Sequence, residues 1–233
     1  MRAVILAGGR GTRLQPHTNN IPKPLVEIRD GETILSILIQ QLKKYGFDHI
    51  TIAVNHLSEQ IVSYAGDGSK WGVKIDYSHE EIPLNTIGPL TLIEDLPEHF
   101  LTINGDTITD LDYGVFLIEH MNNNRRMSVL VKKLELKIEF GTLSFDKEGK
   151  LQDFIEKPTH TYHVAVGVNC YSRAVIDGLS KNTPYGFDQL MKDSIESGEE
   201  VYVHEEDSFW IDVGRPEDYS NAIKEYEQIK KLF

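Results

Sequence analysis

The chain has 233 residues, with 36 acidic against 24 basic side chains, a formal net charge of −12 and one cysteine, Cys170. This length suits one folded domain with a full hydrophobic core, and the acidic balance without a broad basic face excludes nucleic acid as a partner. The lone cysteine excludes an internal disulfide framework, and the lack of a secretory leader or of about 20 consecutive apolar residues predicts a cytoplasmic protein with no membrane segment.

The first predicted element is a strand over residues 3–7, which stops at the glycines Gly8, Gly9 and Gly11. An apolar run this short is typical of a strand buried on both faces. Glycines directly after such a strand allow a tight bend and bring bare backbone N–H groups close to a ligand. With the cations Arg13 and Lys23 nearby, these amides would form a cradle for a polyanion, and a triphosphate fits best.

Two other glycine-rich motifs fit this segment poorly. A P-loop requires Gly-x-x-x-x-Gly-Lys-Ser/Thr, which does not occur in the chain. A dinucleotide fingerprint requires a third glycine where Leu14 stands, and the acidic residue expected further on is not clearly placed. A plain glycine-rich turn is the remaining alternative, and Pro22 and Pro24 argue against it because they hold Lys23 in a defined place.

The rest of the chain alternates between predicted strands and helices. In the first half, helices are expected over residues 34–45, 58–64 and 86–96, and strands over 49–54, 73–77 and 100–103. In the second half, strands are expected over 127–131, 141–145, 151–155 and 164–171, and helices over 187–194 and 216–231. This order predicts a Rossmann-like α/β fold, with a mixed, mostly parallel sheet flanked by helices and a strand-rich second half.

The string from Ile5 to Leu25 resembles the signature of the sugar-1-phosphate nucleotidylyltransferases, Gly-Gly-x-Gly-Thr-Arg-Leu-x-Pro-x-Thr-x-x-x-Pro-Lys-Pro, and matches it at every fixed position. The resemblance extends from Met1 to about Tyr219. It implies one nucleotidyltransferase domain over residues 1–233, with a nucleotide-binding half at about 1–110 and a sugar-binding half with a C-terminal helix at about 111–233. No left-handed β-helix domain, which some relatives carry, is expected, and a homo-oligomer is possible.

The resemblance implies that an NTP and a sugar 1-phosphate are converted to an NDP-sugar and pyrophosphate with Mg²⁺. A carboxylate beside a triphosphate suits this cation, and Asp106 follows a predicted buried strand, where ligands collect in parallel sheets. The family places Asp106 and Asp212 as the metal ligands, and Arg13, Lys23 and Lys157 as the catalytic cations. The nucleotide-binding residues that it implies are Leu6, Ala7, Gly8, Gly9, Gly11, Thr12, Arg13, Lys23, Asn85, Gly88 and Asp106.

A second part of the resemblance concerns the sugar phosphate. Residues 154–158, Phe-Ile-Glu-Lys-Pro, match the family segment in which the glutamate accepts hydrogen bonds from sugar hydroxyls and the lysine neutralises the phosphate. These positions are Glu156 and Lys157 here. Gly141 resembles the glycine that lets the backbone meet the sugar, and Asn169 lies near the family's sugar-facing strand.

The segment expected to read the nucleobase departs from the family at two positions. Residues 83–90 align with Pro-Leu-Gly-Thr-Ala-Gly-x-Leu but carry Asn85 and Ile87. Asparagine tolerates a left-handed turn, whereas the bulkier Ile87 would reshape the pocket for the nucleobase. This segment therefore does not decide which nucleobase the protein binds. Residues 41–46 and 66–72 resemble mannose-1-phosphate and heptose-1-phosphate guanylyltransferases, which favours GTP with either sugar phosphate. The alternatives are a cytidylyl-, uridylyl- or thymidylyltransferase, or a non-catalytic nucleotide-sugar-binding regulatory subunit.

Overall fold

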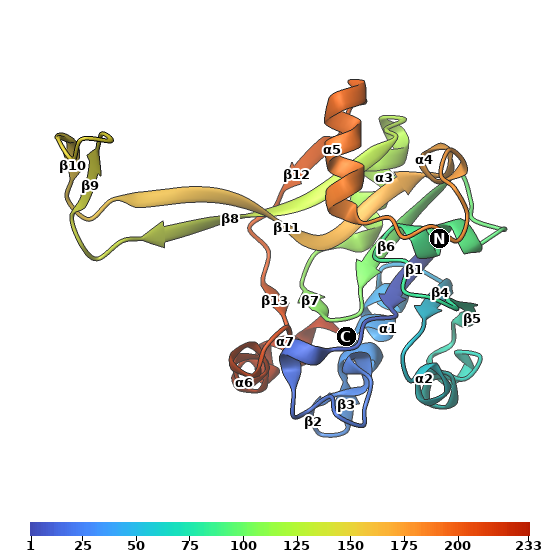
Figure 1. Ribbon diagram of the computed structural model, residues 1–233. Helices are drawn as coiled ribbons and strands as arrows, with labels where there is room; N and C mark the ends of the chain where they lie inside the picture. The colour runs from blue at the N-terminus through green and yellow to red at the C-terminus, as the bar shows by residue number, and fades with distance from the viewer.

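A seven-stranded sheet organises the molecule, and the computed structural model describes all residues from Met1 to Phe233 (Figure 1). Its strand order is β12-β8-β11-β6-β1-β4-β5. These strands are β1 Arg2–Ala7, β4 His49–Val54, β5 Lys74–His79, β6 His99–Asn104, β8 Met127–Lys137, β11 Thr159–Ser172 and β12 Tyr202–Glu205. Only β11 runs antiparallel to its neighbours β6 and β8, so the predicted mixed, mostly parallel sheet is confirmed.

Three two-stranded sheets and seven α-helices complete the fold (Figure 1). The small sheets pair β2 Glu27–Arg29 with β3 Glu32–Thr33, β7 Thr107–Thr109 with β13 Trp210–Asp212, and β9 Thr142–Phe145 with β10 Leu151–Ile155. The helices are α1 Ile34–Lys44, α2 Ser58–Ala65, α3 Tyr113–Asn122, α4 Arg173–Asp177, α5 Phe187–Ser197, α6 Pro216–Lys224 and α7 Tyr226–Ile229. None of the helices is long and apolar enough to cross a membrane.

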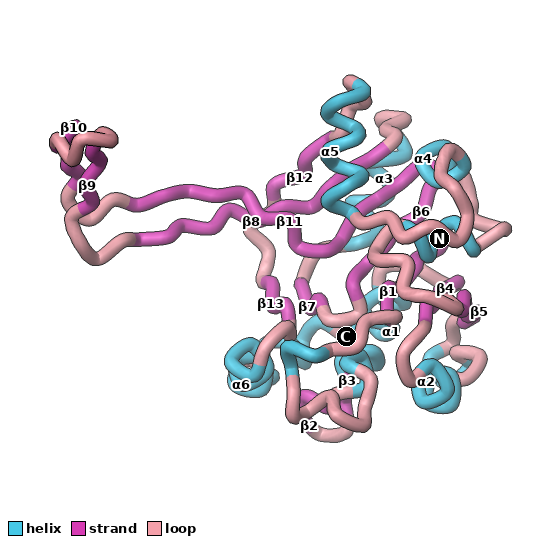
Figure 2. Tube along the Cα trace, viewed as in Figure 1, coloured by secondary structure: helices cyan, strands magenta, loops and turns pink.

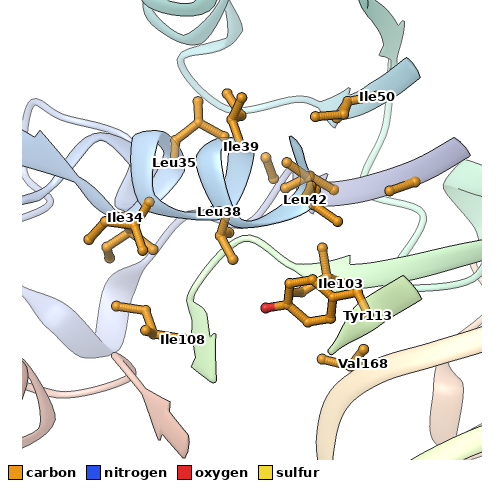
Figure 3. Packing of buried hydrophobic residues seen from close by; sticks show 14 of the residues in the cluster. Ile34, Leu35, Leu38, Ile39, Leu42, Ile50, Ile103, Ile108, Tyr113 and Val168 are labelled. Atoms are coloured by element: carbon orange, nitrogen blue, oxygen red, sulfur yellow. The ribbon is translucent and has the colours of Figure 1, made fainter. Parts of the chain in front are cut away.

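Strand β1 lies between β4 and β6 and is buried on both faces, as its apolar run predicts. Ala3 and Ile5 pack into the larger core cluster, which includes the buried side of α1, whereas Val4 packs into a second cluster on the opposite face. Figure 3 shows the α1 side chains Leu38 and Leu42 directed at the strand layer. Burial on both faces holds β1 rigidly, and its carboxyl end therefore offers a fixed support for a ligand site.

The helix expected over residues 86–96 is wrong. The structure has only a 3₁₀ segment at Gly88–Leu92, with Pro89 in its first turn. Its apolar residues recur every three positions, the period of a 3₁₀ helix, and Ile87 and Leu90 are buried in the second cluster. Backbone N–H groups of Ile87 and Gly88 both donate to the Tyr185 carbonyl, so tertiary contacts replace helical hydrogen bonding here. The single helix expected over 216–231 is likewise divided into α6, α7 and a 3₁₀ turn at Lys230–Leu232.

Strands β8 and β11 continue past the body of the sheet as a two-stranded ribbon, residues 132–165, which we call the arm (Figure 2). Sheet β9–β10 lies at its far end (Figure 1). The first five residues of β8 include Val131 and are buried, while Lys133 to Lys137 are exposed. The arm carries nine large exposed hydrophobic side chains, Leu134, Leu136, Phe140, Leu143, Phe145, Leu151, Phe154, Ile155 and Tyr162.

His120, on α3, makes the stability of the fold depend on pH. The side chain is fully buried, and its ring nitrogens lie 2.9 Å from Ser128 Oγ and 3.1 Å from His99 Nδ1. Burial, with smaller effects from the charges of His99 and Arg125, lowers the pKa of His120 to about 4. The unfolded chain, with an ordinary histidine pKa, therefore binds more protons than the folded chain between roughly pH 6.5 and 4.

We expect the free energy of unfolding to fall as the pH drops through this window, by on the order of 3 kcal/mol from His120 alone. Urea unfolding at a series of pH values measures this dependence. The variant His120→Gln does not titrate and should show a shallower loss. Equal pH slopes in the two proteins would contradict the assignment.

Candidate active site

A pocket of about 460 Å³ opens at the carboxyl ends of β1, β4 and β6. Its wall is formed by Leu6 and Ala7 from the end of β1, by the glycine loop that follows, and by Asn104 at the end of β6. Parallel strands present their carboxyl ends at one edge of a sheet, and ligands bind there in open α/β sheets. The position of the pocket thus follows from the strand order.

The loop after β1 needs glycine for two separate reasons. Gly11 has φ 64°, a left-handed conformation that side chains rarely adopt, and its carbonyl accepts a 2.7 Å hydrogen bond from Thr18 Oγ1. At Gly8 an added Cβ would come within 2.4 Å of Glu80 Oε1, so the loop and the Glu80 side chain touch. An added Cβ at Gly9 meets nothing within 4 Å, which leaves its backbone open to a ligand.

Lys23 also lines the pocket, next to Gly11, and its side chain is only 10% exposed. It sits in the 3₁₀ turn Lys23–Leu25, where Pro22 and Pro24 surround it. Its ammonium group pairs with Asp106 Oδ2 and lies 3.9 Å from Asp212 Oδ1. One cation therefore faces both of the carboxylates that the sequence predicts as metal ligands.

The short β7–β13 sheet brings the two aspartates together although 106 positions separate them in the chain. Asp212 ends β13 and is paired in register with Thr107 of β7, next to Asp106. The Val213 N–H donates to the Asp106 carbonyl at 3.0 Å, which holds the two strand ends side by side. On the other side, Gly105 approaches β1 closely, and its N–H donates to the Leu6 carbonyl at 2.9 Å.

The electrostatics of the pair favour a further cation. Burial first, and the charge of Asp106 second, raise the pKa of Asp212 to about 6, while Lys23 and Arg13 act in the opposite direction. Asp212 Oδ1 is buried without a hydrogen-bond partner. A divalent cation held by these two carboxylates and completed by phosphate oxygens would satisfy that atom. The structure contains no group of three or more acidic, histidine or cysteine side chains that could hold a metal ion by themselves, so at this site phosphate oxygens would have to complete the ligand set.

Most residues predicted to bind the nucleotide line this one pocket. They are Leu6, Ala7, Gly8, Gly9, Gly11, Thr12, Arg13, Lys23, Asn85 and Asp106. Asn85 has φ 64°, so it adopts the left-handed conformation expected of it. Gly88 does not line the pocket. An added Cβ there would lie 2.7 Å from the Thr183 carbonyl oxygen, and this glycine therefore serves close packing of the backbone against residues 183–185.

The residues predicted to bind the sugar phosphate are divided between two places. Gly141, Glu156 and Lys157 gather at the base of the β9–β10 sheet at the end of the arm, and none of them lines the pocket. Asn169 lies in a smaller cavity of about 120 Å³ that shares Leu6, Thr86 and Asn104 with the main pocket. Its Oδ1 atom is buried and has no hydrogen-bond partner. Asn169 is therefore the predicted sugar residue that lies beside the nucleotide pocket within the same chain.

Several pocket residues were missed by the sequence reasoning, above all Asn55 and Glu80. Each follows the end of a strand, β4 or β5, so their positions at carboxyl ends were the available signal. Asn55 Nδ2 donates to the Glu80 carbonyl at 3.0 Å, and Glu80 Oε2 accepts a 2.9 Å hydrogen bond from the Leu84 N–H. Partial burial raises the pKa of Glu80. These contacts hold the 80–84 loop to the residue after β4 and close it on the Glu80 side chain.

Alanine substitutions at two glycines test the loop geometry. In Gly11→Ala, a Cβ in the left-handed region would lie 3.1 Å from Thr18 Cγ2 and 3.3 Å from Lys23 Cβ. We expect this variant to lose roughly 1–2 kcal/mol of stability, since left-handed backbone carries about that penalty for a non-glycine residue. Gly9→Ala, with open space around its Cβ, should melt at the wild-type temperature. Thermal unfolding without ligand checks both, and identical melting temperatures would disprove the strain at Gly11.

The structure is that of an α/β protein whose sheet edge carries a pocket with a glycine loop, a buried lysine and paired carboxylates, features that suit a bound polyanion. The family model described as nucleotidyl transferase matches residues 2–229, and the chain belongs to that family.

Comparisons with individual proteins agree with this membership. The chain is 32% identical over 97% of its length to the mannose-1-phosphate guanylyltransferase catalytic subunit beta of Dictyostelium discoideum, and it spans 64% of that relative. It is 31% identical over 96% of its length to a UTP–glucose-1-phosphate uridylyltransferase of Synechocystis sp., of which it spans 63%. The solved structure of HddC from Yersinia pseudotuberculosis complexed with GMP-PN is similar with a TM-score of 0.74, 26% identity and coverage of 97% of this chain and 99% of that one.

Proposed function

We propose that this protein transfers a nucleotidyl group from an NTP to a sugar 1-phosphate and releases pyrophosphate. The observation that carries the proposal is the convergence of the glycine loop, Lys23 and Asp106 on one pocket in a chain of the nucleotidyl transferase family. GTP is the preferred donor in this proposal, and mannose or heptose 1-phosphate the acceptor. Support comes from the guanylyltransferase relative and from the similarity to a structure complexed with GMP-PN.

In the proposed reaction an oxygen of the sugar phosphate attacks the α-phosphorus in line, and the bond from that phosphorus to the bridging β-phosphate oxygen breaks. The electron pair of that bond leaves with pyrophosphate. The nucleophile is already an anion, so the site needs alignment and charge neutralisation rather than a general base. Arg13 would neutralise the leaving pyrophosphate, Lys23 the α-phosphate region, and Lys157 the attacking phosphate.

Mg²⁺ is the cofactor that we propose, with Asp106 and Asp212 as its protein ligands. The unpartnered Asp212 Oδ1 and the shared position beside Lys23 support this choice. When bound, the cation would neutralise charge on the phosphates. The ammonium of Lys23 has a separate role, because it holds the two carboxylates in a fixed geometry and reduces their mutual repulsion.

The similarity to a uridylyltransferase makes UTP a second candidate for the nucleotide donor. Pyrophosphate release tests both readings, with GTP, CTP, UTP, dTTP and ATP crossed with mannose, glucose and heptose 1-phosphates in the presence of Mg²⁺. Rapid pyrophosphate release from GTP with one of the sugar phosphates supports the proposal. Rapid release from UTP instead shows that the protein is a uridylyltransferase. Nucleotide binding with no turnover in any pair would instead favour the regulatory-subunit reading.

We also propose a homo-oligomer as the working form, since the exposed hydrophobic side chains of the arm call for a partner surface.

A further inference from the structure

The arm is an amphipathic ribbon with one uncovered apolar face. Leu134 is paired in register with Tyr162, and Leu136 with His160. Side chains alternate between the two faces of a strand, so these four residues share one face. Lys133, Glu135 and Lys137 lie on the other face. Leu134, Leu136 and Tyr162 are 44%, 55% and 53% exposed, although such a pattern is typical of a strand pair with one face packed.

The far end of the arm also exposes apolar side chains. In the β9–β10 sheet Leu143 is paired with Phe154 and Phe145 with Leu151, and all four are more than half exposed. This sheet packs chiefly on itself and lies away from the body of the molecule (Figure 1). An isolated two-stranded sheet is marginally stable in water, so a covering surface is needed.

The predicted sugar-phosphate residues lie at this same end. An added Cβ on Gly141 would come within 3.0 Å of Glu156 Oε2, so these two positions are close together. Lys157 adopts φ 47°, a strained left-handed conformation for a lysine, of the kind that is common at functional sites. Three of the four predicted sugar-phosphate residues, Gly141, Glu156 and Lys157, are therefore gathered on the arm, away from the pocket of their own chain.

Hydrogen bonding between β8 and β11 holds the arm as one extended ribbon that leads away from the pocket of its own chain (Figure 1). Pairing between β8 and β11 runs from Met127–Tyr171 to Lys137–Thr159, and the Ile138 N–H extends it to the Pro158 carbonyl at 2.9 Å. The register is interrupted only between Ala165 and Asn169, at the base of the arm.

The base of the arm, in contrast, lies beside the pocket. Ala165 and Gly167 line the small cavity that adjoins it, and an added Cβ on Gly167 would lie 2.4 Å from Asn104 Nδ2. Each chain thus carries its pocket at the base of the arm, and Glu156 and Lys157 at the end. In a two-fold dimer whose arms lie antiparallel, the end of each arm reaches the base of the other.

Charge also favours a second copy as the partner. Between positions 132 and 165 the chain has six basic and six acidic residues, so the arm is neutral although the whole chain carries −12. A neutral apolar arm can approach a strongly acidic body without the repulsion that two such bodies exert on each other.

Resting on the proposed function, we infer that two copies of this chain form a two-fold dimer through their arms, and that each arm delivers Glu156 and Lys157 to the partner's pocket. The apolar faces of the two arms pack on each other, and each active site is complete only with residues of both chains.

Assembly is tested without reference to activity. Light scattering after size exclusion should give twice the 26.5 kDa of one chain. The double variant Leu134→Ser/Leu136→Ser should elute as a monomer, whereas Val115→Ser, 60% exposed on α3, should remain a dimer. A monomeric wild type, or a dimer that the arm variant leaves unchanged, overturns the inference.

Two experiments test whether the end of one arm enters the pocket of the other chain, namely disulfide cross-linking and kinetic complementation. Native Cys170 is buried, so the double variant Arg10→Cys/Lys157→Cys reports on one engineered pair. Oxidation should produce covalent dimers on a non-reducing gel, and disulfide-linked monomers would show delivery within one chain. This result does not depend on turnover, so a failure of the proposed reaction is seen separately.

Complementation provides the kinetic readout. Lys23→Ala and Lys157→Ala should each be nearly inactive, while mixed and reassorted subunits should recover about a quarter of the wild-type rate, since half the dimers hold one complete site of two. Delivery within one chain gives no recovery, because every intact pocket then has a defective arm. A mixture that stays inactive after confirmed subunit exchange overturns delivery to the partner.

Discussion

Lys23→Ala should reduce kcat by about 10²–10³-fold, the loss expected when one preorganised donor to the transition state is removed. Lys23 is the buried cation of the pocket and faces both Asp106 and Asp212. Without it the two carboxylates lose the charge that offsets their repulsion. Because the Lys23 charge lowers the pKa of Asp212, the substitution should also raise that pKa above its present value of about 6.

Steady-state kinetics with the preferred substrate pair measure the first effect, and carboxyl NMR measures the second. Lys23→Met separates charge from packing, since methionine retains most of the apolar stem. It should be as inactive as the alanine variant while melting at a higher temperature. A near-normal kcat in either variant would rule out a catalytic role for this ammonium group.

Asp106→Asn has the second large expected effect. It removes one of the two carboxylates proposed for the metal and the direct ion-pair partner of Lys23. We expect turnover to fall by at least about 100-fold and the Mg²⁺ concentration for half-maximal rate to rise, since divalent cations depend on ionised oxygen ligands. The pKa of Asp212 should fall, because the charge of Asp106 is the second-largest cause of its elevation.

Asp110→Asn is the matched control, since Asp110 is exposed, lies four positions further along and does not line the pocket. It should retain wild-type activity and Mg²⁺ dependence. Calorimetric titration of Mg²⁺ in the presence of nucleotide gives a readout apart from turnover. Unchanged Mg²⁺ binding by the Asp106→Asn protein would remove this carboxylate from the proposed metal site.

The first part of the site could be predicted because its determinants are local. A buried strand followed by Gly8, Gly9 and Gly11 specifies both a tight bend and exposed amides, whatever the rest of the chain does. Pro22 and Pro24 likewise place Lys23 through backbone geometry alone. The alternation of strands and helices predicted a mostly parallel sheet, and the observed strand order around β1 determines which edge of that sheet carries the pocket.

The pairing of Asp106 with Asp212 could not be derived in this way. It depends on β7 and β13, two strands of three residues each that have no distinct periodicity. Only the family resemblance pointed to it. The roles of individual site residues, and the division into a nucleotide half and a sugar half, stay predictions.

The errors have physical causes that can be traced to particular residues. Over 86–96 Ile87, Leu90, Ile93 and Leu96 recur every three positions, and Pro89 together with the contacts to Tyr185 favours a 3₁₀ segment over the expected α-helix. The strands predicted over 127–131 and 164–171 stop short of the ribbon itself, which extends β8 to Lys137 and starts β11 at Thr159. Alternation over 133–137, Lys-Leu-Glu-Leu-Lys, is the period of a strand with one face covered, and a chain read alone does not show what covers it.

The β7–β13 pairing has a consequence for synthesis of the protein. The glycine loop, Lys23 and Asp106 are synthesised at least 106 residues before Asp212, which takes its place only when β13 pairs with β7. Domains fold progressively as the chain emerges. A nascent chain can therefore form its glycine loop long before the second carboxylate joins Asp106.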